Sequence, residues 1–309
     1  MYKGKGGRFM LKKKWFWISV FILIFVIAGC SSNIDDNSEE NAADDEHTPP
    51  SIDDLDPNDP ATEAIQYGEE IFNETNTMTP EHVGNELSCQ SCHADGGLAN
   101  TSSMVGVAAD YPQYRPREGV VFTLEDRING CMVRSMNGEM FDNDSEEMRS
   151  LMAYLTYISE GVEIGQDRPW VVVNSLDELP EPDVDNGKEL YTEKNCMTCH
   201  GDDGQGTGAN SGPALWGDDS FNDGAGMGRL TKAAGYIQNN MPVGEEGTLS
   251  DQEATNLAAY MLMHDRPEWK GHDDDFPHEA DQQTSLQKTV AKKSNQVISI
   301  GQKLRMSIR

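Results

Sequence analysis

The pattern of apolar and polar positions repeats once along this chain. Residues 68–72 (GEEIF) and residues 187–191 (GKELY) both read as glycine, two charged residues, an aliphatic residue and an aromatic residue. Each run is typical of an amphipathic helix that carries an aromatic side chain into a core. Further along, residues 148–158 and residues 254–263 each have helical character again. The repetition predicts two similar units between residues 61 and 270.

Capping signals mark where the second helix of each unit begins. The sequences DSEE, at residues 144–147, and SDQE, at residues 250–253, each place a small polar residue three positions before a glutamate. This pattern satisfies the free amide groups at a helix start. Both helices also contain the pair Ala-Tyr, at residues 153–154 and 259–260. The shared details support a true internal repeat.

Strand signals are nearly absent. The one β-branched run is VVV at residues 171–173, and it falls between the two units. We therefore predict an all-α fold with an N-terminal domain at 61–160 and a C-terminal domain at 183–270. A linker at 161–182 joins them, and three prolines mark it.

Each unit contains one C-x-x-C-H motif. Two thiols this close can form thioethers with the two vinyl groups of one porphyrin, and the following histidine becomes the proximal iron ligand. Zinc would need further Cys or His residues nearby, and a thioredoxin-like redox pair is the other alternative. Two copies favour haem, so we expect two covalently bound haems c, each wrapped by one cytochrome c-like domain. The motif residues are Cys89, Cys92 and His93, and Cys196, Cys199 and His200.

The first 29 residues have the pattern of a secretory signal. Three lysines precede an apolar run from Trp15 to Ala28, which is short for a membrane span of about 20 residues. The Ala-Gly-Cys ending resembles a lipoprotein signal, so Cys30 is predicted to carry lipid. An uncleaved N-terminal anchor is the alternative. Both interpretations place the remaining chain outside the cytoplasmic membrane and attached to it.

Acidic residues dominate the mature chain. Residues 31–60 hold eleven Asp or Glu, four Pro and no Lys or Arg, so we predict a disordered tether at 30–60. Beyond residue 29, 18 basic residues face 53 acidic ones, a net charge of −35. This charge argues against nucleic acid as a partner and would attract a basic redox partner, although simple solvation also explains it. Residues 271–309 form a polar tail without an assigned role.

A distal iron ligand can be proposed for the second unit. Met241, in the sequence NMP, lies nine residues before the predicted cap Ser250. In single-haem cytochromes c the methionine comes from such a loop, and a thioether ligand raises the haem potential. The alternative is a core methionine, since the chain holds 15 Met. Met136 lies nine residues before Ser145 and takes the equivalent place in the first unit.

Cysteine arithmetic draws attention to one further thiol. The chain has six cysteines. One cysteine is assigned to lipid and four to thioethers, which leaves Cys131 without a partner for an intramolecular disulfide. Its thiol is therefore inert, forms an intermolecular disulfide or takes part in chemistry. A buried, small apolar residue is the structural alternative. Spacing alone still favours Met136 as the distal ligand.

Residues 127–138 (RINGCMVRSMNG) resemble the dihaem thiosulfate dehydrogenases, the tetrathionate-forming family often called TsdA. The resemblance extends over about residues 61–277. It implies that the first haem forms the active site with His/Cys ligation, which makes Cys131 the distal ligand opposite His93. It also implies that Arg117, Arg127 and Ser135 surround the substrate.

The charges near Cys131 suit this chemistry. Thiosulfate is a dianion, and an acidic protein must supply local positive charge to admit it. Guanidinium groups suit sulfonate oxygens, although haem propionates are alternative partners. Four arginines fall within twenty residues: Arg115, Arg117, Arg127 and Arg134.

We therefore predict an enzyme that oxidises two thiosulfates to tetrathionate, or runs the reverse reaction. Electrons would pass through the second haem, ligated by His200 and Met241, to a cytochrome, a copper protein or a quinol-linked complex. Two alternatives remain: a plain dihaem electron-transfer cytochrome, and a SoxA-like sulfur-handling cytochrome.

Overall fold

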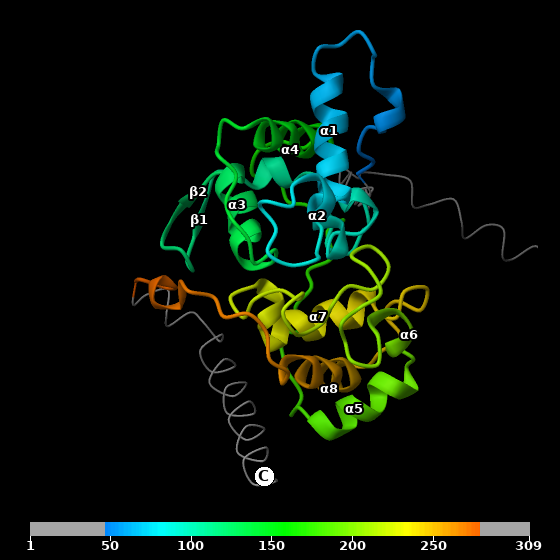
Figure 1. The fold of residues 1–309 in the computed structure, drawn as a ribbon. Helices are drawn as coiled ribbons and strands as arrows, with labels where there is room; N and C mark the ends of the chain where they lie inside the picture. Colours follow the sequence, from blue (N-terminus) through cyan, green and yellow to red (C-terminus); the bar gives the residue numbers. More distant parts are fainter. Residues whose placement is uncertain (1–46, 279–309) are drawn as a thin grey trace, which may run out of the picture. The chain divides into compact units, whose positions relative to one another are not determined.

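A computed structural model describes residues 47–278 of the chain (Figure 1). The expected signal at 1–29, the lipidation site Cys30, the tether before residue 47 and the tail from residue 279 lie outside the described residues. Within residues 47–278, no helix combines the length and apolar character that crossing a bilayer requires.

Helices make up most of the described structure. The α-helices are α1 (Thr62–Asn73), α2 (Thr75–Met78), α3 (Leu124–Arg134), α4 (Glu146–Tyr157), α5 (Val184–Glu193), α6 (Met197–His200), α7 (Leu230–Asn240) and α8 (Asp251–Leu262). Short 3-10 helices are η1 (Ile52–Asp54), η2 (Cys89–Ser91), η3 (Asp95–Gly97), η4 (Val107–Asp110), η5 (Gly226–Gly228) and η6 (His272–Asp274). The two strands are β1 (Gln113–Arg115) and β2 (Val120–Phe122). The predicted all-α architecture is confirmed, with one small hairpin added.

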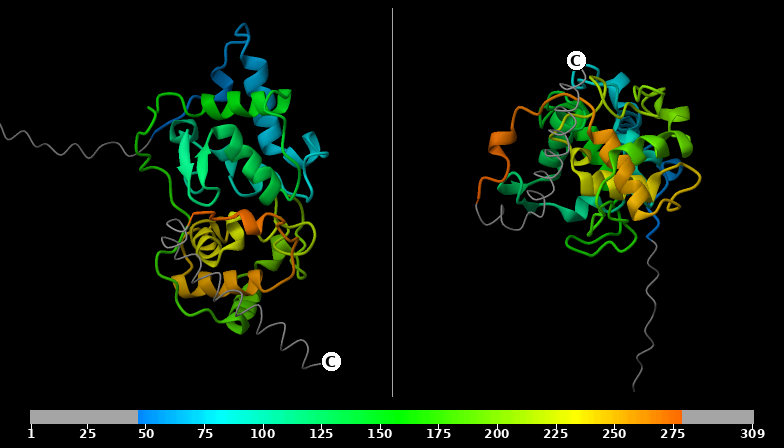
Figure 2. Two further views of the ribbon diagram at one scale, coloured as in Figure 1. Left: turned by 90° about the vertical axis from the view of Figure 1, so that its left-hand side faces the viewer. Right: turned by 90° about the horizontal axis from the view of Figure 1, so that it is seen from below.

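The sequence repeat corresponds to one helix crossing in each domain. In the first domain α1 packs on α4, and in the second α8 packs between α5 and α7 (Figure 2). The helices come very close together at the glycine of the repeated pattern. A Cβ on Gly68 would lie 1.9 Å from the carbonyl oxygen of Ser150, and one on Gly187 would lie 2.1 Å from that of Asn256. Only glycine fits there, which explains why both runs begin with it.

The aromatic residues of the repeat fill the two cores as expected. In the first domain Tyr154 is fully buried, and its hydroxyl donates a 2.7 Å hydrogen bond to the carbonyl of Gly96. In the second domain Tyr191 is buried and donates in the same way to Gly201, at 2.6 Å. Both carbonyls lie just after a C-x-x-C-H motif. Each core aromatic therefore anchors the loop that leaves the motif.

The helix caps differ between the two domains. Ser250 and Glu253 form the complete reciprocal capping box at the start of α8. In the first domain the cap is Ser145, whose hydroxyl accepts from the amide of Met148 at 3.2 Å. No side chain returns to the backbone amide of Ser145, because Met148 occupies the glutamate position.

Two short strands were not expected from the sequence. β1 and β2 pair antiparallel, with Tyr114 opposite Val121. Three residues per strand are too few for a clear alternating pattern. The β-branched run at 171–173 instead contributes one isolated parallel bridge, between Val172 and Thr101.

The acidic segment at 47–60 contacts the first domain, unlike the disordered tether that its composition predicts. The ring of His47 lies 3.1 Å from the carbonyl oxygen of Glu160. The hydroxyl of Tyr157 donates to the carbonyl of Ser51 at 2.7 Å. These contacts use backbone carbonyls, which composition does not report. From residue 47 onward the segment is therefore attached to the first domain by hydrogen bonds.

Candidate haem and substrate sites

The two motif histidines share one arrangement. Nδ1 of His93 lies 2.7 Å from the carbonyl oxygen of Ser102, and Nδ1 of His200 lies 2.8 Å from that of Pro213. A ring N–H that donates to a carbonyl leaves Nε2 as the metal-binding atom. Burial lowers the pKa of both histidines, against the opposing effect of the carbonyl hydrogen bond. Both rings thus favour the neutral form that ligates iron.

The motif thiols are not used in disulfides. Burial raises the pKa of Cys89 to about 12 and that of Cys92 to about 11. The pKa of Cys196 is raised by burial as well. None of the cysteines within residues 47–278 forms a disulfide, so all four motif thiols are available. The donor set fits two haems c, held by these cysteines and by His93 and His200.

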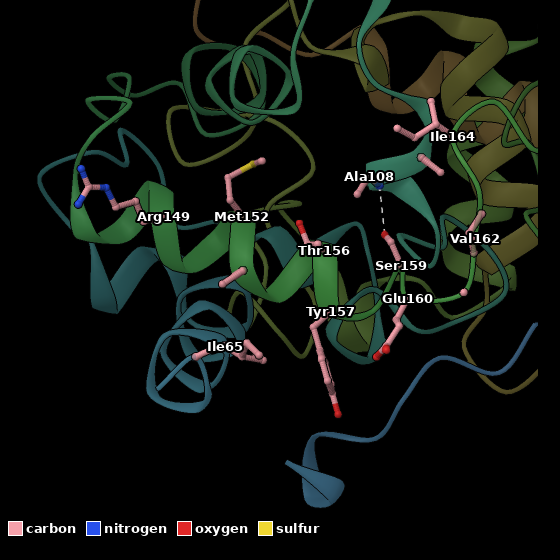
Figure 3. Close-up of a pocket in the computed structure, with 14 residues that line it drawn as sticks. Ile65, Ala108, Arg149, Met152, Thr156, Tyr157, Ser159, Glu160, Val162 and Ile164 are labelled. Carbon is pink, nitrogen blue, oxygen red and sulfur yellow. Dashed lines mark hydrogen bonds between the residues drawn. The ribbon is translucent and has the colours of Figure 1, made fainter. Parts of the chain in front are cut away.

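An open pocket of about 800 Å³ on the first domain is separate from these motifs (Figure 3). Its walls are largely apolar, and neither a motif cysteine nor a motif histidine lines it. Two of its lining residues form a hydrogen bond, in which the amide of Ala108 donates to the hydroxyl of Ser159 at 3.1 Å. We do not assign this pocket to the haem or substrate site.

Helix α3 positions the leftover thiol. Thr123 and Asp126 form a reciprocal capping box at its start. Arg127 and Cys131 lie one turn apart on this helix, so their side chains share a face. Nη1 of Arg127 donates to Sγ of Cys131 at 3.0 Å. The pKa of Arg127 is raised, chiefly by its electrostatic interaction with Cys131 and against the effect of burial.

Cys131 also lies close to the first haem motif. After burial, the electrostatic interaction with Cys131 is a further cause of the raised pKa of Cys92, and it contributes to the raised pKa of Cys89. Met136, the ligand that spacing favours, is only 3% exposed and belongs to the apolar core. Cys131 therefore lies near the first motif, and Met136 lies in the apolar core of the same domain.

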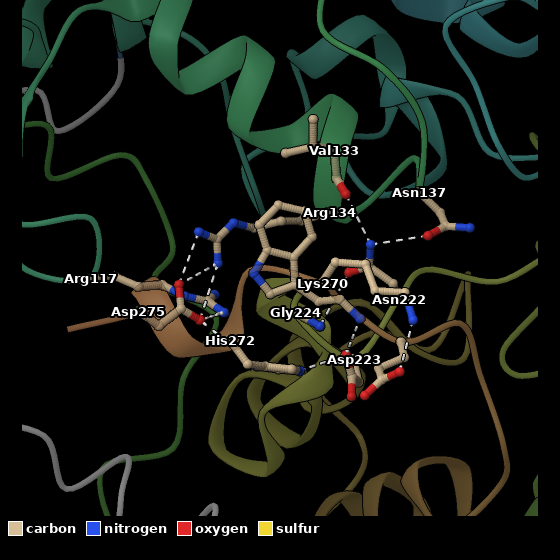
Figure 4. Close-up of polar contacts among 12 residues, drawn as sticks. Arg117, Val133, Arg134, Asn137, Asn222, Asp223, Gly224, Lys270, His272 and Asp275 are labelled. Atoms are coloured by element: carbon tan, nitrogen blue, oxygen red, sulfur yellow. Dashed lines mark hydrogen bonds and ion pairs between the residues drawn. The ribbon is translucent and has the colours of Figure 1, made fainter. Parts of the chain in front are cut away.

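Two of the expected substrate arginines are paired with one carboxylate. Nη2 of Arg117 lies 2.7 Å from Oδ2 of Asp275, and Nη2 of Arg134 lies 3.1 Å from Oδ1 (Figure 4). Burial raises the pKa of Asp275, but these two guanidinium groups outweigh burial and lower it. Arg134 also lies over the ring of Trp269, at 4.8 Å from its centroid. Asp275 therefore joins the segment after residue 271, which the sequence leaves as an unassigned polar tail, to the first domain. His272 contacts Asp223 of the second domain instead.

The other two predicted residues flank this region. Arg115 lies on β1, where Nη1 donates to the side chain of Gln113 at 3.4 Å. Ser135 caps the end of α3, and its amide donates to the carbonyl of Cys131 at 2.8 Å. The amide side chain of Asn85 donates to the Ser135 carbonyl at 2.8 Å. Ser135 is therefore held one turn from the thiol by backbone contacts.

Sequence reasoning missed Arg229, which belongs to the second domain. This residue caps the start of α7. Its pKa is lowered to about 10, first by burial and then by the positive charges of four first-domain arginines. Within residues 47–278 it forms no ion pair with a carboxylate. A cation at a helix N-terminus is unfavourable. The position of Arg229 directly before a helix was therefore the feature of the sequence that could have marked it as a functional residue. The four arginines are Arg115, Arg117, Arg127 and Arg134.

Buried guanidinium groups also leave donors for a bound anion. Nε of Arg117 and Nη1 of Arg266 are buried without a hydrogen-bond partner in the described part of the chain. Carboxylates such as porphyrin propionates have the chemistry to pair with them. This observation agrees with the propionate alternative for part of the arginine set.

Met241 ends α7 and opens the loop that leads to α8. Its amide donates to the carbonyl of Ile237 at 3.0 Å. The preceding Asn240 is buried, and its side chain donates to the carbonyl of Tyr236 at 2.8 Å. The predicted placement of Met241 between α7 and the last helix of the domain is thus observed.

Comparison with known proteins agrees with this arrangement. Residues 68–164 match the SoxA/TsdA cytochrome c domain, and residues 184–265 match cytochrome c. A thiosulfate dehydrogenase of Psychrobacter arcticus is 39% identical, over 72% of this chain and 69% of the relative. This chain belongs to the thiosulfate dehydrogenase family. The enzyme of that name from Allochromatium vinosum is 40% identical, over 66% of this chain and 79% of the relative.

A solved structure extends the comparison. The thiosulfate dehydrogenase TsdBA of Marichromatium purpuratum matches with a TM-score of 0.67 and 35% identity, over 72% of this chain and 50% of that chain. This chain therefore spans half the length of TsdBA. The predicted pair of cytochrome c domains, the covalent haem c groups and the oxidoreductase class are confirmed by these relationships.

Proposed function

We propose that this chain joins two thiosulfates into tetrathionate at the first domain. An S–S bond forms between the two sulfane sulfurs, and two electrons leave. Each haem, when bound, accepts one electron at a time, so two haems match the two-electron oxidation. The observation that carries this proposal is the 3.0 Å contact between Arg127 and the sulfur of Cys131.

Electrostatics explains why the arginines gather there. Two thiosulfates bring four negative charges to a chain whose net charge is already −29. Positive charge at the site offsets this repulsion and attracts the substrate. The guanidinium groups of Arg127 and Arg229 are the best candidates for contact with substrate, because Asp275 already pairs with Arg117 and Arg134. The resemblance still favours a substrate role for Arg117 and Ser135.

The proposed iron ligands set the direction of electron flow. His93 and Cys131 would ligate the first iron, and His200 and Met241 the second. A thiolate ligand lowers the reduction potential and a thioether raises it. Electrons would then pass from the first domain to the second and on to an external redox protein. Tetrathionate reduction is the same step run backward.

Cys131 has a second part in this scheme as a sulfur nucleophile. A thiolate attacks sulfur readily, and the adjacent Arg127 stabilises its negative charge. The Cys131 thiolate would bond to the sulfane sulfur of one thiosulfate as two electrons leave, and the sulfane sulfur of the second thiosulfate would then displace the Cys131 thiolate as tetrathionate forms.

We also propose that the protein works outside the cytoplasmic membrane as a lipoprotein. The apolar run that ends at Cys30 supports this, and so does the covalent attachment of haem c, which takes place after export. Cys30→Ser should release the protein from membranes or leave its signal uncleaved. Unchanged attachment and cleavage in this variant would contradict lipidation.

Cys131→Gly tests the catalytic proposal. Both haems should stay attached, as a pyridine haemochrome assay measures, while thiosulfate-dependent ferricyanide reduction is lost. The electron paramagnetic resonance signature of a low-spin His/thiolate haem should disappear with it. Met136→Leu is the matched control, because it changes the competing ligand and preserves side-chain volume. Full activity in Cys131→Gly would refute the proposal.

A further inference from the structure

One hydrogen-bonded path joins the proximal side of the first haem site to the second domain. The carbonyl of Ser102 accepts the bond from Nδ1 of His93, at 2.7 Å. Ser102 has a φ of 59°, in the left-handed region that costs energy for a residue with a side chain. Its hydroxyl accepts from Nδ2 of Asn174, which lies in the linker. The linker therefore helps to hold the residue that orients His93.

The other end of the Asn174 side chain contacts α7. Its Oδ1 accepts from Nδ2 of Asn239 at 3.0 Å and from Nδ2 of Asn240 at 3.2 Å. Asn240 is buried and directly precedes Met241. An amide offers one acceptor oxygen and one donor nitrogen. Asn174 uses the oxygen toward the second domain and the nitrogen toward the first.

Backbone contacts fix the linker on both sides of Asn174. The amide of Val172 donates to the carbonyl of Asn100 at 3.2 Å, in the loop that follows the first motif. The amide of Leu176 donates to the carbonyl of Thr231 on α7 at 3.1 Å. A Cβ on Gly235 of α7 would lie 2.3 Å from the amide nitrogen of Ser175. Asn174 is thus held in place from both sides.

We propose that Asn174 is a positioning residue that couples the proximal ligand of the first haem to the distal-ligand loop of the second. The proposal rests on the ligand assignments of the proposed function. The hydrogen bond from Nδ1 to a carbonyl sets the orientation and basicity of a ligating histidine, and so tunes the metal. Anchoring Asn240 fixes the start of the loop that carries Met241. One side chain therefore sets the environment of both irons.

The test compares reduction potentials of the two haems, resolved by spectroelectrochemistry. Asn174→Ala should shift both potentials and weaken the Met-to-iron charge-transfer band. Ser102→Ala should shift the first haem alone, and Asn240→Ala the second alone. Asn186→Ala is the matched control, because Asn186 also accepts from an asparagine, Asn256, at 2.8 Å but touches neither haem loop. It should shift neither potential.

Each result decides a separate question. Asn174→Ala with one or both potentials unchanged would overturn the coupling. If that variant fails to fold, Ser102→Ala and Asn240→Ala carry the test, and an unchanged potential at the expected haem overturns it. A wild-type protein without the Met-to-iron band would instead refute the ligation by Met241 on which the coupling rests.

Discussion

The guanidinium of Arg127 lies 3.0 Å from the sulfur of Cys131, measured from Nη1 to Sγ, one turn away on α3. The sequence presents Arg127 as one of several charges around a dianionic substrate. The contact with Cys131 indicates a more specific role for Arg127, since a hydrogen bond to a thiolate stabilises the charged sulfur itself. Arg127 would therefore affect the chemistry of the sulfur as well as the binding of substrate.

Arg127→Gln should impair turnover as well as binding. Loss of a hydrogen bond to a charged group costs about 1.5–3 kcal/mol, which corresponds to a loss of roughly 10- to 150-fold in kcat/KM. Steady-state thiosulfate oxidation and the resonance spectrum of the first haem measure the effect. Arg149→Gln, at an exposed position of α4, should leave both unchanged. A rise in KM alone would show that Arg127 acts only as a distant charge.

Arg229→Gln tests whether the second domain contributes to substrate binding. The substitution removes a positive charge that faces the first-domain arginines, so KM for thiosulfate should rise several-fold with little change in kcat. The dependence of kcat/KM on ionic strength should also weaken. Lys188→Gln removes the same charge from an exposed position on α5 and should change neither. Equal effects of the two substitutions on KM would show that only the net charge of the protein matters, and not the position of Arg229.

Asp275→Asn should loosen the attachment to the first domain of the segment at residues 271–275, which runs through Asp275. The carboxylate pairs with Arg117 and Arg134 and has a pKa below its usual 3.8. A lowered pKa means that the stabilisation is complete above 3.8 and is lost as the pH falls through the lowered value. Hydrogen exchange at these residues should therefore increase at acidic pH in the wild type.

The substitution should produce the same rapid exchange at neutral pH. Asp273→Asn is a suitable control, because Asp273 is exposed in η6, the short helix that directly precedes Asp275. Slow exchange of the segment in Asp275→Asn would show that other contacts, such as that of Arg134 with Trp269, are sufficient to hold it.

Gly68→Ala and Gly187→Ala should each destabilise one domain. The added Cβ would meet a backbone carbonyl of the crossing helix at 1.9 Å and 2.1 Å, and overpacking typically costs about 1–3 kcal/mol. Gly130→Ala, in α3, meets only a carbon of Phe122 at 3.8 Å and should gain about 0.5–1 kcal/mol. Thermal unfolding measures all three. Unchanged stability in the first two would mean that the helices separate easily.

The sequence predicts those features of this fold that are local or repeated. The run GEEIF and its copy GKELY identify the two helix crossings, because a close approach admits only glycine. The C-x-x-C-H motifs identify the haems, because covalent attachment fixes residue type and spacing. Cys131 stood out since it was the one thiol without an assigned use.

Features that depend on distant residues could not be predicted in this way. Asp275 meets Arg117 and Arg134 across more than 140 positions of sequence, and nothing in its neighbours signals that contact. Arg229 approaches the arginines of the other domain only after both have folded. The acidic composition at residues 47–60 predicted disorder, because composition does not report which backbone carbonyls find donors.

Met241→Gly should remove the Met-to-iron charge-transfer band of the oxidised protein. Met241 follows α7 directly, and its amide is fixed by Ile237 at 3.0 Å, so the loop presents this residue in one place. Without the thioether, the second haem should have a lower potential. Electron transfer onward should then slow, while the thiolate signature of the first haem persists.

Met136→Leu is the decisive comparison for this prediction. Met136 has the same spacing to its cap, but it is only 3% exposed and belongs to the apolar core. Leucine preserves its volume at a cost below about 1.5 kcal/mol, so the band should remain. Loss of the band in Met136→Leu, with its retention in Met241→Gly, would assign the Met-ligated iron to the first domain. Cys131 would then lose its place as an iron ligand, because Met136 would occupy the distal position.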